Sequence, residues 1–507
     1  MPASPSTLFR PLSCAAALCL LLASPAPAQT ARGLLEDALE KTAQAVTPGP
    51  GGAATAAGSQ SPGRPTVQPD GRACAGCPQR RPGHALLQTT YVNLFYGLGN
   101  LARGQVTARI TPASWWANMR HGWVWDLDDF VVNQFGHPYQ GSNYFNTGRG
   151  NGLSFWESAA TTAFGSATWE YFGETNRASL NDFINTTLGG IALGEMFHRA
   201  AWLVRRPETT GLGREIAAAA IDPLTGLNRF LSGDASRVTE KPADLVPVSL
   251  GGLASVGVLW QGSEGRAVES TGKPFVEMDL LYGDMATGRS RTPYDAFFVR
   301  LRLGGGSAIS SARIRGRLAG RPLGDGRFQL TVSQNYDFEK NEAYEFGAQA
   351  FEVNLGVTQQ LSSRVSVRIV AGGGVTVLGA VNSRPLVEPE DPMPAAIESG
   401  QGISEGPRTF DYGPGSNFAA TVTFRYDDRE FAVLSAEGRH LYVVDGVRAN
   451  HLLQRFSLDL LAPLRGPLGI GVSGEYFDRR TYFKDDARTR QRFYYPQFRV
   501  FLTWRLS

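Results

Sequence analysis

The chain has 507 residues, enough for two or three domains, and a formal net charge of only +3. So small a charge argues against a nucleic-acid partner, which needs a strongly basic surface. Hydrophobic residues make up 42% of the sequence, alongside 59 glycines and 10% aromatic residues. This composition disfavours several transmembrane helices and fits a β-barrel, whose strands are only half apolar.

The first 28 residues have the pattern of a signal peptide. Arg10 supplies a positive charge, Leu12–Leu22 is a short apolar run, and Ala26–Ala28 is a small-residue cleavage site. The apolar run is about half as long as a membrane-spanning helix requires. We therefore expect cleavage after Ala28 and export of the mature chain.

Residues 29–84 predict a disordered linker, because Gly, Pro, Ala, Ser and Thr dominate and cannot bury enough apolar surface to fold. The linker holds both cysteines of the mature chain, Cys74 and Cys77. In an oxidising compartment, the pair predicts a local disulfide. The alternative is a redox pair or half of a metal site, but no second cysteine pair completes a zinc site.

Residues 85–240 predict an α-helical domain. Apolar residues recur at helical spacing in Leu86–Leu101, Leu153–Phe172 and Leu180–Val204. Polar residues interrupt the last two helices, so we expect both to cross the inner membrane during export rather than remain in it. Small residues at four-residue spacing predict that these two helices approach each other closely, namely Ala159, Ala163, Ala167, Gly190 and Gly194.

From residue 246 to residue 507, apolar residues recur at every second position. In the last segment Phe498, Val500, Leu502, Trp504 and Leu506 alternate with mostly polar residues. About twelve such segments follow one another, and their connections alternate between short and long. An even count and this asymmetry predict a membrane β-barrel of about twelve antiparallel strands. The alternative, a soluble β-sandwich, has no reason for the bias in connection length.

Three strings in the helical region resemble an uncharacterised family of Gram-negative envelope proteins, known only as a domain of unknown function. They are His121–Asp126, His137–Phe145 and Asn181–Glu195. The resemblance implies an exported protein that pairs this block with a C-terminal barrel. It implies no substrate and no catalytic residue.

Glu195 and His198 lie three residues apart on one predicted helix face. Such a pair helps to build di-metal sites in helical bundles, here with carboxylates from Glu157, Glu170 and Asp182. A complete site needs two such pairs, and the sequence has one. The alternative is that Glu195 and His198 satisfy each other inside the domain.

His137 is predicted to lie in a loop between helices, where Asp128 or Asp129 would orient it as a general base. No recognisable nucleophile motif accompanies it. The alternative is that its Asn, Gly, Pro and Tyr neighbours only shape a tight turn.

Five arginines fall on the polar face of the predicted third and fourth strands and form a basic wall in the lumen: Arg300, Arg302, Arg313, Arg315 and Arg317. If water reaches this wall, it favours anions in a pore or attracts lipid phosphates. We favour the alternative, neutralisation by Glu277 and Asp279 or by acidic groups of a helical plug. Long side chains leave little open space in a barrel of this size.

Together these patterns predict an outer-membrane β-barrel, with its N-terminal region in the periplasm and its helical domain at or in the periplasmic mouth. We expect a structural role, or binding or transport of a small solute or lipid. The alternative is an enzyme acting on lipid or lipopolysaccharide, with His137, Glu195 and His198 as candidates. The expected partners are outer-membrane lipids and the barrel-assembly machinery, and no cofactor, metal or nucleic acid is expected.

Overall fold

The computed structural model describes residues 77–205, 211–262, 271–285, 289–382, 410–427, 429–484 and 490–506. The predicted signal peptide, residues 29–76 of the predicted linker and Cys74 lie outside these described residues. Cys77 is disulfide-bonded.

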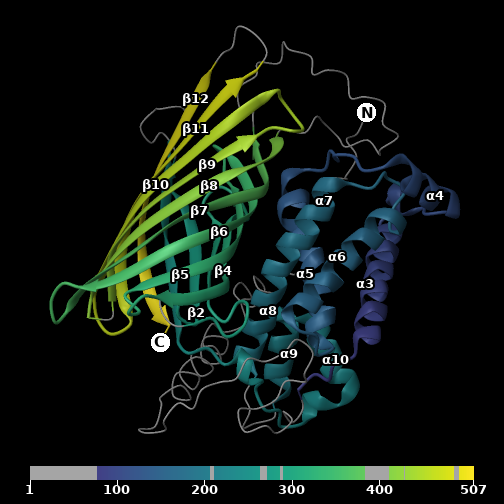
Figure 1. Cartoon of the computed structure of the whole chain (residues 1–507), viewed down its shortest axis with the longest axis horizontal. Helices are drawn as coiled ribbons and strands as arrows, with labels where there is room; N and C mark the ends of the chain where they lie inside the picture. Colours follow the sequence, from purple (N-terminus) through teal and green to yellow (C-terminus); the bar gives the residue numbers. More distant parts are fainter. Residues whose placement is uncertain are drawn as a thin grey trace.

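Helices occupy the N-terminal part of the described chain (Figure 1). None of these helices is both long enough and apolar enough to cross a membrane. The α-helices are α3 Pro82–Ala102, α4 Pro112–His121, α5 His137–Gly150, α6 Phe155–Phe172, α7 Leu180–Ile184, α8 Gly190–Val204, α9 Leu212–Ile221 and α10 Pro223–Ser232. Two π-helices, η2 Val132–Gly136 and η3 Asn185–Gly189, lead directly into α5 and α8.

In the described residues, twelve antiparallel strands close into a barrel, because β1 pairs with both β2 and β12. The predicted membrane β-barrel fold is confirmed. The strands are β1 Leu250–Gln261, β2 Lys273–Tyr282, β3 Phe297–Gly304, β4 Ile309–Leu323, β5 Phe328–Lys340, β6 Glu345–Gln360, β7 Val365–Asn382, β8 Phe410–Tyr426, β9 Arg429–Tyr442, β10 Ala449–Pro463, β11 Leu468–Phe483 and β12 Gln491–Leu506.

Strand β5 shows how alternation separates the two faces of the wall. Asp337 and Glu339 point into the lumen, where they meet arginines from distant strands. Phe338, between them, and the other even-numbered residues of the strand face outward, because successive side chains point to opposite faces of a sheet. Outward-facing Phe328 is 41% exposed at one end of the strand, whereas outward-facing Tyr336 is completely buried.

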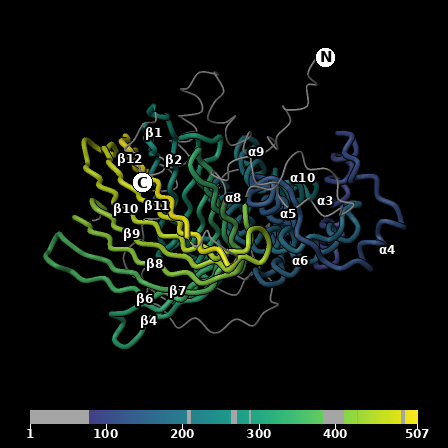
Figure 2. The backbone as a smooth tube through the Cα atoms, turned by 90° about the horizontal axis from the view of Figure 1, so that it is seen from above, coloured from purple at the N-terminus to yellow at the C-terminus, as the bar shows by residue number. Residues whose placement is uncertain are grey.

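The helical domain accounts for this difference, because it packs against the outer face of the barrel (Figures 1 and 2). The Tyr336 hydroxyl donates a hydrogen bond of 2.7 Å to the carbonyl oxygen of Gln134. Gln334 Nε2 donates one of 2.9 Å to the carbonyl oxygen of Leu188. These contacts correct the prediction that the helices lie at or in the mouth of the lumen.

Within the helical domain, the closest helix contact lies between α5 and α8. A Cβ atom added at Gly141 would overlap the carbonyl of Thr186, and one added at Gly190 would overlap the backbone of Gly141. The prediction that Gly190 and Gly194 pack against the alanines of α6 is therefore wrong about the partner. Both glycines face α5 instead, and Gly194 lies against Phe145.

Candidate functional site

The helical domain contains a cavity of about 1570 Å³ that is partly open to its surroundings. One wall is apolar and comes mainly from Leu87, Tyr91 and Phe95 on α3 and from Leu227 and Leu231 on α10. The other end is polar. Its acidic residues and its histidine are Asp126, Asp128, Glu174, Asp182 and His137, and Arg177 also lines the cavity.

A short backbone pairing brings the polar end together. Val124 N donates to Ala178 O at 2.9 Å, and Leu180 N donates to Val124 O at 2.8 Å. This bridge fixes the segment before η2 beside the start of α7, where the Ser179 side chain accepts a hydrogen bond from the backbone of Asp182. Side chains distant in the sequence therefore meet at one point.

His137 opens helix α5 and does not lie in a loop, contrary to the prediction. The π-helix η2 runs without a break into α5, and Pro138 sits in the first turn. Proline lacks the N–H that would bond the preceding turn, and the carbonyl oxygen of Gln134, four residues earlier, instead accepts the hydrogen bond from Tyr336. The π-helices η2 and η3 both border the polar end, and such irregular turns are frequent at functional sites.

Hydrogen bonds orient the polar groups. Asp126 Oδ1 accepts from Asn181 Nδ2 at 2.7 Å and from Asn133 Nδ2 at 3.1 Å. His137 Nδ1 lies 3.3 Å from Thr186 Oγ1, and Nε2 lies 3.4 Å from Asp182 Oδ1. These contacts hold the aspartate and the imidazole in fixed orientations within the cavity.

Asp128 belongs to the same group, because the possible ligand atoms of Asp126, Asp128 and His137 all lie within 4.8 Å of one another. Asp129, the other residue predicted to orient His137, instead accepts hydrogen bonds from the backbone of Val131 and Val132. His137 and Asp128 were therefore predicted from the sequence, whereas Asp126 was missed as their neighbour. The closely spaced aspartates of the string Asp-Leu-Asp-Asp at 126–129 could have indicated that Asp126 belongs to this group.

Burial and mutual repulsion change the acidity of these carboxyl groups. Burial, with the charges of Asp126 and Asp129, raises the pKa of Asp128 to about 7. Burial, with the charges of Asp128 and Asp126, raises the pKa of Glu174 to about 8. Burial lowers the pKa of His137 and so favours its neutral, proton-accepting form.

Glu195 and His198 lie elsewhere and use other partners. Glu195 binds Arg199 at 2.8 Å and Arg149 at 2.9 Å. His198 Nδ1 lies 2.9 Å from Asp222 Oδ2. The structure therefore does not bring Glu195 and His198 to one site with the carboxylates suggested by the sequence.

Those other carboxylates also have local roles. Glu157 completes a capping box with Ser154 at the start of α6, and Glu170 accepts a hydrogen bond of 2.7 Å from the backbone of Ser179. Across the described residues, the cluster with spacing suited to a metal ion is Asp126, Asp128 and His137.

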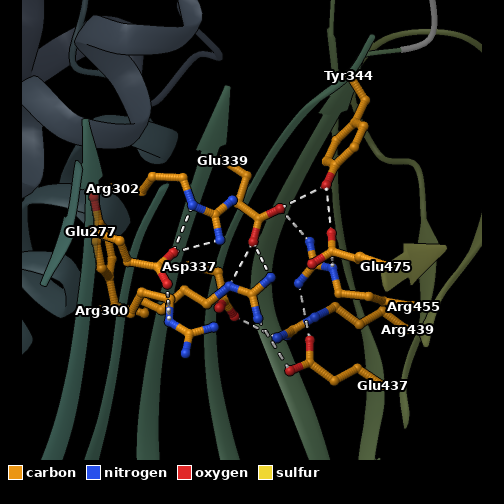
Figure 3. Close-up of polar contacts among 12 residues, drawn as sticks. Glu277, Arg300, Arg302, Asp337, Glu339, Tyr344, Glu437, Arg439, Arg455 and Glu475 are labelled. Atoms are coloured by element: carbon orange, nitrogen blue, oxygen red, sulfur yellow. Dashed lines mark hydrogen bonds and ion pairs between the residues drawn. The ribbon is translucent and has the colours of Figure 1, made fainter. Parts of the chain in front are cut away.

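The five lumen arginines each lie beside a carboxylate (Figure 3 shows part of the network). Arg300 pairs with Asp279, Arg302 with Glu277, Arg313 with Glu339, Arg315 with Asp337, and Arg317 with Asp295. Two partners lie on β2 and two on β5, with Asp295 in the connection between β2 and β3. The basic wall is thus neutralised by acidic side chains of the barrel region itself.

Some ion pairs cross the lumen. Arg455 on β10 binds Glu339 on β5, and Arg439 on β9 binds Asp337 on β5. Because β5 is four or five strands away from these partners around the ring, the side chains bridge opposite parts of the wall. Tyr344, at the end of the β5–β6 connection, adds a hydrogen bond of 3.3 Å to Glu475 on β11. The lumen is therefore crossed by charged side chains.

The polar end of the cavity lies within a segment that matches a family model. Residues 122–224 match the model of a family described as "Domain of unknown function (DUF3943)". This match confirms the predicted relationship to an uncharacterised family, and the matched segment includes Asp126, Asp128, His137 and Asp182. Among curated proteins, none matches the chain.

Several solved structures have a similar barrel fold. A NanC porin shares 8% identity, with 50% of this chain and 98% of that chain covered and a TM-score of 0.26. A KdgM porin shares 6% identity, with 49% and 98% covered and a TM-score of 0.22. The toluene transporter TodX of Pseudomonas putida shares 8% identity, with 52% and 91% covered and a TM-score of 0.20. Identities and scores this low transfer no ligand or activity to this chain.

Proposed function

We propose that this protein is an outer-membrane β-barrel that binds an amphiphile in the cavity of its helical domain. The observation that carries the proposal is the cavity itself, which has an apolar wall from α3 and α10 and a polar end around His137. Lipid-binding sites need this combination, because the acyl chain and the headgroup require different surroundings. The partners in this proposal are outer-membrane lipids and, during biogenesis, the barrel-assembly machinery.

The surface of the helical domain supports contact with lipid. Phe95 and Leu231, both at the cavity, are 75% and 78% exposed. Large exposed apolar areas mark sites that contact a membrane or a partner. Further exposed apolar side chains of α3, α9 and α10 extend this area: Leu86, Leu94, Leu98, Leu101, Leu212, Ile216, Leu227 and Phe230.

The connection lengths support an orientation for the barrel. We place the short connections 361–364, 427–428 and 464–467 in the periplasm, as is usual for bacterial barrels. The end of β5 and the start of β8 then face the cell exterior. Asn181 lies 3.4 Å from the Tyr412 hydroxyl near the start of β8, so the polar end of the cavity would lie toward the outer leaflet.

A channel through the lumen has less support. Ion pairs between β5 and the β9–β10 region occupy the space that a solute would cross. The helices lie outside the wall, so they offer no gate for the lumen. The cavity is the better candidate for ligand binding.

The test is lipid retention by the full-length protein, purified from outer membranes in mild detergent and analysed by native mass spectrometry. Phe95→Asp places a charge in the cavity wall and should greatly reduce the fraction of protein that carries lipid. Met119→Asp is the control, because Met119 is exposed on α4 and neither lines the cavity nor belongs to this apolar area. Equal lipid retention by both variants, or no bound lipid in the wild type, contradicts the proposal.

A lipid-modifying enzyme is the second candidate, favoured by the buried imidazole of His137 beside carboxylates within the cavity. A positioned histidine of this kind can act as a general base. His137→Gln should abolish turnover of outer-membrane lipids at unchanged protein abundance if the protein is an enzyme. Unchanged lipid composition in cells with and without the wild-type protein argues for binding alone.

A further inference from the structure

We infer that Asp126, Asp128 and His137 form a binding site for one divalent transition-metal ion, of which Zn²⁺ is the representative. The possible ligand atoms of all three residues lie within 4.8 Å of one another at the polar end of the cavity. Ligands of a tetrahedral zinc ion at about 2.0–2.1 Å lie about 3.4 Å apart. Small side-chain rotations therefore bring the three residues to coordination distance.

The imidazole of His137 provides an observation independent of the acidic residues. His137 is only 8% exposed, and its Nε2 atom has no hydrogen-bond partner among the described residues. Leaving a buried polar atom without a hydrogen bond costs about 1–3 kcal/mol, so such an atom calls for an explanation. Asp182 Oδ1 lies 3.4 Å away but does not meet the geometry of a hydrogen bond. A metal ion would satisfy Nε2 directly.

The surroundings of the three residues resemble those of metal ligands. Metal-bound histidines usually have their second ring nitrogen held by a hydrogen bond, which fixes the ring. Here Thr186 Oγ1 lies 3.3 Å from Nδ1 and can serve that purpose. Asn133 and Asn181 likewise orient the carboxylate of Asp126.

The nearby carboxyl groups also favour a cation. In the part of the chain that the structure describes, Asp128, Glu170 and Glu174 form no ion pair with lysine or arginine. Carboxylates close together without a cation repel one another. A divalent ion at the polar end would reduce this repulsion.

The ligand set indicates the class of metal. Imidazole nitrogen suits Zn²⁺ and neighbouring transition metals, whereas Ca²⁺ and Mg²⁺ prefer all-oxygen sites. Three protein ligands leave at least one position open, as in zinc sites that bind a water molecule or substrate. That position would face the cavity. This inference goes beyond amphiphile binding, and its test requires no lipid.

The test is equilibrium dialysis of the full-length protein in detergent micelles against Zn²⁺, after removal of metals with EDTA. The wild type should bind one Zn²⁺ per chain at this site. His137→Gln and Asp128→Asn should each weaken binding at least tenfold, because each removes or weakens a ligand. Mg²⁺ and Ca²⁺ should compete poorly.

Two matched variants control for position and charge. His121→Gln removes an exposed histidine outside the cluster, and Asp129→Asn removes a neighbouring charge while keeping an oxygen for the backbone of Val131. Both should bind Zn²⁺ as the wild type does. Visible absorption of Co²⁺ provides a second readout, because tetrahedral ligation gives an intense band that should disappear in His137→Gln while the barrel stays folded.

Wild-type protein that retains no Zn²⁺ would overturn the inference, as would equal binding by all five proteins. The first result would indicate that the cluster is a metal-free polar network centred on His137 and Asp182. Loss of lipid in Phe95→Asp with intact Zn²⁺ binding would leave both proposals standing. Zn²⁺ binding without any bound lipid would contradict only the proposal of amphiphile binding.

Discussion

The barrel lumen and the helical-domain cavity both collect charged side chains, but they arrange them differently. In the lumen, four arginines face carboxylates on neighbouring strands, Arg317 faces Asp295 in the β2–β3 connection, and further pairs join opposite parts of the wall. In the cavity, carboxylates gather around His137, and Asp128 and Glu174 have no arginine or lysine partner in the described chain. Paired charges fill space and stabilise a closed wall, whereas unbalanced charges in an open cavity are suited to a ligand.

The largest effect is expected from breaking the paired charges of the lumen. Glu339→Ala leaves Arg313 and Arg455 without their shared buried partner, which should lower the free energy of unfolding of the barrel by about 3–5 kcal/mol. Denaturant unfolding followed by the heat-modifiable mobility of the barrel on gels measures this loss. Glu342→Ala, which removes an exposed partner of Lys273, should change it little. Equal stability of the two variants would show that the lumen network is not structural.

The next largest effect is expected from disturbing the close helix contact at Gly141 in the domain that contains the cavity. Gly141→Ala forces a methyl group against the backbone of Thr186 and should destabilise the helical domain by about 1–3 kcal/mol. Gly97→Ala is the matched control, because an added methyl group there meets nothing within 4 Å. It should be neutral or stabilise helix α3 by up to about 1 kcal/mol. Limited proteolysis of the helical domain compares the two. Similar protease resistance would contradict the close contact between α5 and α8.

The stability of the helical domain should also fall in acid. Burial lowers the pKa of His198, which faces Asp222, Arg149 and Glu195. The unfolded chain then binds a proton more tightly than the folded chain, so stability is full above about pH 6.5 and falls below it. The pKa of Asp222 is also lowered despite its burial, mainly by its hydrogen bond with His198, and this contribution is likewise lost in acid.

Thermal unfolding of the helical domain, followed by circular dichroism, should therefore shift to lower temperature between about pH 7 and pH 5. His198→Gln should flatten this dependence. A slope that is equally steep in the variant would assign the acid sensitivity to other groups.

The smallest effect should come from the interface between the barrel wall and the helical domain. Tyr336→Phe removes one hydrogen bond, from the barrel to the carbonyl oxygen of Gln134, and should cost about 1 kcal/mol. Protease cleavage of the helical domain should become slightly faster, while the barrel keeps its mobility on gels. Tyr426→Phe, on an exposed part of β8, provides the comparison. No difference between these variants would weaken the evidence that the helices are anchored on the outer wall.

The sequence predicted the barrel well but not the position of the helices. Alternation identifies strands because one face is polar and the other apolar, whatever covers the apolar face. Phe328 and Tyr336 follow the same pattern, although one is exposed and the other lies beneath the helical domain. Outward-facing residues therefore did not reveal that part of the wall contacts protein.

The candidate site was only partly predictable for a similar reason. His137 was selected by residue type, but Pro138 suggested a turn where the chain forms the first turn of a helix. Asp182 meets His137, and Asn181 binds Asp126, because the Val124–Ser179 bridge joins distant segments. The spacing of Glu195 and His198 correctly predicted that both lie on one helix. In the fold, however, Glu195 pairs with Arg199 and His198 pairs with Asp222.

We propose that ligand binding occurs in the cavity beside the barrel and not in the lumen. Photo-crosslinking in intact cells tests it directly, with a benzophenone amino acid placed either at Leu227 in the cavity wall or at Thr331 on the lumen face of β5. We expect a lipid adduct at position 227 and none at position 331. An adduct at position 331, with none at position 227, would contradict it.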